Sequence, residues 1–151
     1  MATTIDDQAI AQAIATRFTS ANVTPPTGED NIRVSTEQLP DRIGPTPTVL
    51  VFPSEDEVHV TASTRSMRMA YPVSFYLYKT QDTPRQAARL NKWRKVLRAQ
   101  LDSSTQLSLS DYVATAEVTG VRAGTLTYAD EAFDGVELIV TVGAWEGVTF
   151  A

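Results

Sequence analysis

The side chains best suited to catalysis or metal binding are few, and they gather around one histidine. His59 is the single histidine of the chain and lies in EDEVHV, beside Glu55, Asp56 and Glu57. Glu57 and His59 are two residues apart, so on a strand they point to the same face and could share a metal ion. A transition-metal site would need further histidine or cysteine ligands, and the chain has no cysteine. We therefore expect no metal and interpret these residues as surface polar groups.

Nucleophilic catalysis has as little support in the sequence. A serine–histidine–aspartate triad would have to recruit His59, and nothing points to a particular serine. The motifs G-x-S-x-G, G-x-x-x-x-G-K-[ST], G-x-G-x-x-G and H-E-x-x-H do not occur. We expect the protein not to be an enzyme, with no catalytic residue and no cofactor.

A second group of residues is suited to binding. The segment TPRQAARLNKWRKVLRAQL, residues 83–101, contains no acid, whereas the whole chain has 18 Asp plus Glu, 13 Lys plus Arg and a net charge of -5. The pattern predicts a helix, with Asp82 or Thr83 as its cap and Pro84 at its first position. Its cations are Arg85, Arg89, Lys92, Arg94, Lys95 and Arg98.

At about 100° per residue, these cations divide between two arcs of the helix. Leu90, Trp93, Leu97 and Leu101 form an apolar arc; Arg85, Arg89, Lys92 and Lys95 lie opposite it, Arg98 lies at the margin, and Arg94 falls inside the apolar arc. The basic arc is either a solvated outer face or a docking surface for an acidic partner. We expect no specific nucleic-acid recognition, because the chain is acidic and contains no recognisable nucleic-acid module.

Two tyrosines form a second candidate interface. In YPVSFYLYK, residues 71–79, alternation places Val73, Phe75 and Leu77 on one face of a strand, with Tyr76 and Tyr78 on the other. Tyrosines on the polar face of a strand are either covered by another element or available to a partner. Pro72 cannot donate to a ladder, so we expect it at the start of this strand or on a sheet edge.

The order of the predicted helices and strands, which must position these residues, indicates an α+β fold. We expect one mostly antiparallel or mixed sheet flanked by two main helices, in a single domain over residues 1–151. A first helix is expected over residues 3–20, with Thr3 and Asp6 as a capping box. Strands are expected at 48–52, 57–62, 71–79, 112–121 and 135–142. Residues 22–48 hold five of the eight prolines and predict a long arm, with an extended piece at 32–34. We expect this arm to contact a partner and to become ordered on assembly.

Composition limits the setting of the protein. No apolar run is long enough to span a bilayer, so we expect no membrane contact. The N-terminus, MATTIDDQAI, has two acids where a signal peptide would carry basic residues, which argues against export. A cytosolic or virion setting fits both observations.

The order of the motifs resembles one known family. An amphipathic helix is followed by an arm containing LPDRIGPTPTVLVFPSEDEV, then by YPVSFYLY, the TPRQAARLNKWRKVL helix, VATAEVTGV and YADEAFDGVELIVTV. Together these segments, which cover most of the chain, resemble the tail terminator (tail completion) proteins of long-tailed bacteriophages. The most distinctive pieces are PVSFYLY leading into the helix and FDGVELIVTV near the end.

The resemblance implies a non-enzymatic virion protein that is made in the host cytoplasm and then joins the neck or tail. Such proteins form a ring, usually a hexamer, that caps the tail tube and joins it to the head. Their partners are other copies of themselves, the tail tube protein and the head–tail connector proteins, and DNA passes through the ring. The alternatives are a head-closure or head–tail adaptor protein, and a small enzyme or binding domain with the Pro-rich arm as a lid.

Overall fold

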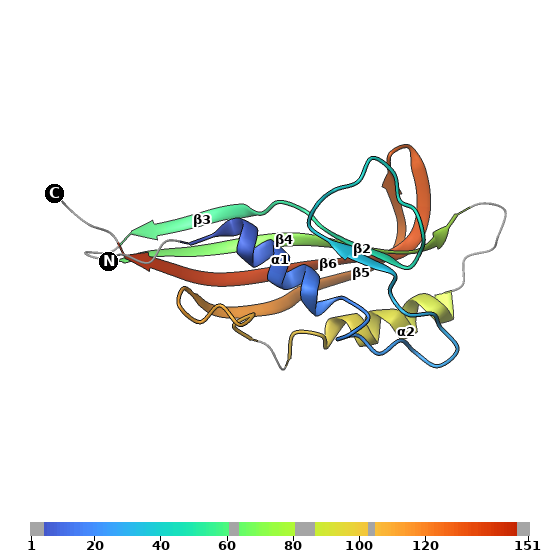
Figure 1. Ribbon diagram of the computed structural model, residues 1–151, viewed down its shortest axis with the longest axis horizontal. Coiled ribbons are helices and arrows are strands. Elements are labelled where there is room, and N and C mark those ends of the chain that lie inside the picture. Colours follow the sequence, from blue (N-terminus) through green and yellow to red (C-terminus); the bar gives the residue numbers. More distant parts are fainter. Residues whose placement is uncertain (1–4, 61–63, 81–86, 103–104, 148–151) are drawn as a thin grey trace.

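The computed structural model describes residues 5–60, 64–80, 87–102 and 105–147, which form one sheet with two helices packed on it (Figure 1). The elements are α1 (Asp7–Arg17), β1 (Val34–Thr36), β2 (Thr48–Val51), β3 (Glu55–Val60), β4 (Thr64–Lys79), α2 (Ala87–Arg98), β5 (Val113–Tyr128) and β6 (Glu131–Gly147). Their order and types confirm the predicted α+β fold.

The sheet has six strands and is mostly antiparallel. Its order is β1-β2-β4-β6-β5, and β3 pairs with β4 beside β2. Only the pairing of β1 with β2 is parallel among the described strands. The long strands β4, β6 and β5 form its centre and one edge, and the short strands β1, β2 and β3 form the other side.

The last two strands are much longer than the predicted segments 112–121 and 135–142. β5 has 16 residues and β6 has 17, joined by a two-residue turn at Ala129 and Asp130. Both turn residues have positive φ, 50° and 64°, which is the type I′ geometry that matches the twist of paired strands. The prediction stopped short because this turn lacks the Asn-Gly or Asp-Gly pair by which such turns are recognised in a sequence.

A glycine in β6 allows its close approach to β4. A Cβ atom built on Gly135 would lie 1.9 Å from the carbonyl oxygen of Phe75, well inside van der Waals contact. The same region holds a bulge in β4, where the pairing passes from Tyr76–Gly135 to Tyr78–Asp134 and leaves Leu77 as an extra residue.

Both helices cover the same face of the sheet. From α1, Ile10, Ile14 and Phe18 are fully buried, and they join a core that includes the β4 residues from Met69 to Leu77 that share one face. α1 packs mainly against β1 and β2, whereas α2 packs mainly against β5 and β6. The segment that leads into α1 also reaches β6, because the N–H of Ile5 donates to the Glu146 carboxylate. Among the described residues, no helix is long and apolar enough to cross a membrane.

The first helix starts later than the sequence predicted. It begins at Asp7, and Asp6 is its N-cap, with Oδ1 accepting a hydrogen bond of 3.1 Å from the backbone N–H of Ala9. The predicted capping residue, Thr3, lies outside the described residues. Asp7 in the first turn and Arg17 in the last suit the two ends of the helix dipole.

The Pro-rich arm is packed against the sheet within the single chain. Val23 and Ile32 are buried in the main core, and Ile43 is buried in a second, smaller core on the opposite face. The extended piece is β1, at 34–36 rather than 32–34, and it pairs with β2. The arm therefore passes from one face of the sheet to the other, which a loop of this length makes feasible.

Pro72 lies in the middle of β4, not at a strand start or a sheet edge as predicted. Its carbonyl oxygen accepts a 2.9 Å hydrogen bond from the N–H of Phe52, so its missing N–H would point to the same side. That side is the break between β2 and β3, where pairing passes from Val51–Val73 to Glu55–Ala70. A proline is tolerated there because the ladder is already interrupted.

Candidate interface on helix α2 and the arm

The apolar arc predicted for the basic helix is the face that α2 packs on the sheet. Leu90, Trp93 and Leu97 are all buried, with Trp93 and Leu97 fully enclosed. The Trp93 ring lies 4.6 Å from that of Phe75 on β4, measured between centroids. The helix orientation is therefore determined by its apolar residues, and its remaining side chains face the arm or solvent.

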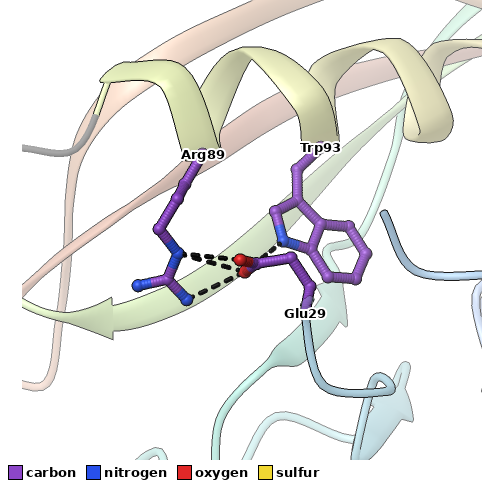
Figure 2. Close-up of polar contacts among 3 residues, drawn as sticks. All are labelled: Glu29, Arg89 and Trp93. Atoms are coloured by element: carbon purple, nitrogen blue, oxygen red, sulfur yellow. Dashed lines mark hydrogen bonds and ion pairs between the residues drawn. The ribbon is translucent and has the colours of Figure 1, made fainter. Parts of the chain in front are cut away.

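One basic residue of α2 is bound to the arm. Figure 2 shows Arg89 and Trp93 pointing to the carboxylate of Glu29, which accepts hydrogen bonds from both. The Arg89 Nη2 to Glu29 Oε1 distance is 2.8 Å and the Nε to Oε2 distance is 3.0 Å, a bidentate pair. The indole nitrogen of Trp93 donates to Oε1 at 3.1 Å. The guanidinium of Arg89 also lies 5.2 Å from the ring centroid of Tyr78, within range of a cation–π contact.

The electrostatics of this group agree with its geometry. The hydrogen bond from Arg89 lowers the pKa of Glu29 below its ordinary value of 4.5, although burial acts in the opposite direction. The pKa of Arg89 is raised, mainly by the same hydrogen bond. The Glu29 side chain is only 10 % exposed, so the charge pair is partly protected from solvent screening.

Arg89 belongs to the arc that the sequence predicts as either a solvated face or a docking surface, and in the folded chain it binds the arm. Its guanidinium attaches the arm to α2, so it belongs to the fold of the single chain. The helical wheel places Arg89 opposite the apolar arc, but the arm returns over that side of the helix and supplies a carboxylate. Helix periodicity alone contains no information about a chain segment 60 residues away.

Three of the predicted cations do form an exposed group. Lys92, Lys95 and Arg98 are exposed, and none of them forms an ion pair with the part of the chain that the structure describes. Their spacing of three residues places them along one side of the helix. Arg94 is half-buried, in keeping with its predicted place inside the apolar arc, and Arg85 lies outside the described residues. We call Lys92, Lys95 and Arg98 the basic face.

Tyr76 is covered by another element of the same chain, so the interpretation in which it is open to a partner does not hold for the folded subunit. Its side chain is 2 % exposed and lies in the second core with Ile43, Leu126 and Phe133. The rings of Tyr76 and Phe133 meet edge to face, 5.3 Å apart between centroids. Burial raises the pKa of the Tyr76 hydroxyl. The tip of the β5–β6 hairpin and the arm cover this face at the right-hand end of Figure 1.

Tyr78 lies on the opposite face from Tyr76, contrary to the predicted alternation. The bulge at Leu77 shifts the register by one residue, so Tyr78 packs against the main core beneath α2. Strict alternation predicts both tyrosines on one face, and one extra residue in a strand is enough to reverse this. Tyr78 remains half-buried beside Arg89.

The residues first considered for metal chemistry lie in β3. His59 pairs through its backbone with Ser66 of β4, and its side chain is outside what the structure describes. Among the described residues, no three histidine, cysteine or acidic side chains are grouped so as to hold a metal ion.

Glu29 is the residue of this site that the sequence reasoning missed. It lies in the arm among prolines and a glycine, where an acid is usually interpreted as a solvated charge. The only usable signal is indirect: Arg89 and Trp93 are one helical turn apart and can donate to the same acceptor.

A scan against models of known protein families finds none that matches the chain, and no curated protein matches its sequence.

Proposed function

We propose that this chain is a structural protein of the neck or tail of a long-tailed bacteriophage: a tail terminator that forms a ring on the tail tube and joins the tube to the head. The resemblance of the ordered motifs from the arm to FDGVELIVTV supports this assignment. The chain carries out no reaction in this role, and its partners are other copies of itself, the tail tube protein and the connector proteins of the head.

The observation that carries the proposal is the basic face. Lys92, Lys95 and Arg98 are exposed and form no ion pair with the described part of the chain, while the chain as a whole has a net charge of -5. Cations in a row repel one another, so grouping them is mildly unfavourable for the isolated helix. Such a surface suits contact with an acidic protein face, which is the kind of contact that a ring subunit needs.

Particles assembled without this protein test the proposal. A protein that caps a growing tube ends its polymerisation, so its loss should give overlong tubes that carry no heads. In particles assembled with it, an antibody or gold label should be seen by electron microscopy only at the neck end of the tail. Tails of normal length with detached heads would instead indicate an adaptor, and label along the whole tail or absent from particles would refute the proposal.

A further inference from the structure

The basic face of α2 forms no ion pair within the part of the chain that the structure describes. The helix contains no acid between Ala87 and Arg98, and its single described ion pair joins Arg89 to Glu29. Lys92, Lys95 and Arg98 are exposed; Lys92 and Lys95 lie opposite the packed arc of Leu90, Trp93 and Leu97, and Arg98 lies at its margin. Such a face can pair with carboxylates that another molecule supplies.

The chain offers an acidic hollow of matching chemistry on α1. Its volume is about 220 Å³. A water molecule occupies about 30 Å³, so the hollow has room for several waters or for one long side chain. The hollow lies between α1 and the segment that joins β2 to β3. Its polar rim is formed by Asp7, Gln8 and Glu37, and its apolar lining includes Ala11, Val51 and Phe52.

Two further acids lie near Asp7 at the N-terminal end of α1. Asp6, Asp7 and Asp111 are exposed near Tyr112, whose pKa is raised first by burial and then by these three carboxylates. A Lys or Arg side chain suits such a hollow because its methylene stem packs on apolar groups while its charge reaches the rim.

The basic face and the acidic hollow lie over different strands of the sheet. α2 packs mainly over β5 and β6, whereas α1 packs mainly over β1 and β2, and the hollow is lined by residues of α1, β2 and β4. No residue of α2 lines the hollow, so the two surfaces do not meet within one subunit. A second copy placed beside the first brings the α2 of one to the α1 of the next.

We propose that the basic face of α2 docks on the acidic hollow of α1 in a second copy of this chain. The contact is heterologous, because two different surfaces meet, and its repetition leads to a ring when the rotation between copies closes. The exposed charges of Lys92, Lys95 and Arg98 then face Asp7 and Glu37 of the neighbour. The proposal rests on the proposed function for the ring itself and adds which surfaces join the subunits.

A charge exchange between two variants tests the contact directly. The helix variant carries Lys92→Glu, Lys95→Glu and Arg98→Glu, and the hollow variant carries Gln8→Lys and Glu37→Lys. Asp7 is kept because its Oδ1 accepts a hydrogen bond from the Tyr71 hydroxyl. Self-association is measured by sedimentation at low salt for the wild type, for each variant and for their equimolar mixture, after circular dichroism has established that each is folded.

The wild type should self-associate and lose association as salt is added, because exposed charges are screened. Each variant alone juxtaposes like charges and should associate at least about tenfold more weakly. In the mixture, the acidic helix of one variant meets the basic hollow of the other and the reverse pair is equally complementary, so association should return to the wild-type level. The control Arg68→Glu/Arg122→Glu makes the net charge more negative, as the helix variant does, but at positions on β4 and β5. It should associate as the wild type does.

Cross-linking provides a second measurement that detects weak association. The chain contains no cysteine, so Lys95→Cys and Glu37→Cys each introduce a unique thiol. A short bifunctional maleimide should join these two variants when they are mixed, but should not join Lys95→Cys to Asp130→Cys.

Two outcomes would overturn the contact. One is a mixture of the charge variants that associates no better than either alone, and the other is the absence of a cross-linked product between the Lys95→Cys and Glu37→Cys variants. If the label is at the neck while these tests fail, the ring proposal stands and the proposed contact does not. If the tests succeed but no label is found in particles, the contact stands and the proposed function does not.

Discussion

The arm is attached to α2 mainly through the Glu29 carboxylate, which accepts hydrogen bonds from both Arg89 and Trp93. Replacing Glu29 with Gln should lower the free energy of unfolding at pH 7 by about 1–2 kcal/mol, because a charge-assisted pair is lost while an amide oxygen can still accept. Denaturant unfolding at pH 7 and at pH 3 measures this.

The pH dependence follows from the direction of the shift. The pKa of Glu29 is lower in the folded chain than its ordinary value of 4.5, so the pair stabilises the fold fully above that value and loses its contribution as the pH falls through the lower folded pKa. The difference between wild type and Glu29→Gln should therefore disappear in acid. Asp30→Asn, which removes a charge from the next, exposed residue, serves as the control. An equal effect of both substitutions at pH 7 would contradict the role assigned to Glu29.

Two glycines of the same hairpin offer a matched comparison. Ala at position 135 would place its Cβ 1.9 Å from the Phe75 carbonyl oxygen, so Gly135→Ala should cost about 3 kcal/mol or more through displacement of β4 from β6. At Gly120 the nearest atoms belong to the Ile139 side chain at 3.5 Å, an ordinary contact, so Gly120→Ala should change stability by less than about 1 kcal/mol. Thermal unfolding distinguishes them, and similar melting temperatures would show that β4 and β6 can separate freely at Gly135.

At the scale of elements, the β5–β6 hairpin is closed by a turn whose residues do not favour its geometry. Ala129 and Asp130 both have positive φ, which costs a non-glycine residue about 1–2 kcal/mol. Ala129→Asn with Asp130→Gly should therefore raise the melting temperature, by an amount that corresponds to about 1 kcal/mol. Ala129→Val should lower it, because a branched side chain is disfavoured there. A lower melting temperature for the Asn-Gly variant than for Ala129→Val would be inconsistent with a type I′ turn.

Helix α2 contributes its stabilising contact through the apolar arc. Leu97 is fully buried, so Leu97→Ala should lower the free energy of unfolding by about 2–5 kcal/mol through a cavity between α2 and the sheet. The neighbouring Arg98 is exposed, and Arg98→Ala should stay within about 0.5 kcal/mol of the wild type. Urea unfolding of the two variants compares what the packed face and the basic face each contribute to stability. Comparable losses in the free energy of unfolding would mean that the basic face also supports the fold.

At the scale of the whole molecule, the arm connects the two cores on opposite faces of the sheet. Val23 and Ile32 anchor it in the main core, Ile43 in the second, and β1 pairs with β2. We therefore expect hydrogen exchange of the isolated subunit to find protected amides at Arg33, whose N–H donates to Pro47, and at Ser35, whose N–H faces β2 on the same side of this edge strand. Residues 27–31 and 38–42 should exchange faster. Uniformly rapid exchange over 22–48 would instead favour an arm that becomes ordered only on assembly.

Local patterns in the sequence determined much of this architecture. The apolar arc of Leu90, Trp93 and Leu97 and the alternation in β4 up to Phe75 follow from periods of 3.6 and 2, which neighbouring residues are enough to specify. The exposure of Lys92 and Lys95 follows from the same wheel. The element order and the fold class are consequences of these local patterns.

Tertiary structure alone decided the rest, because it depends on which distant segments meet. The bulge at Leu77 depends on how β4 pairs with β6, and it separates Tyr76 from Tyr78 onto opposite faces. The carboxylate bound by Arg89 comes from a segment 60 residues earlier that returns over α2. Likewise, the strands against which α1 and α2 pack, β1 with β2 and β5 with β6, are set by contacts between distant segments. A local pattern specifies how a segment folds, whereas strand register and chain return set what that segment finally touches.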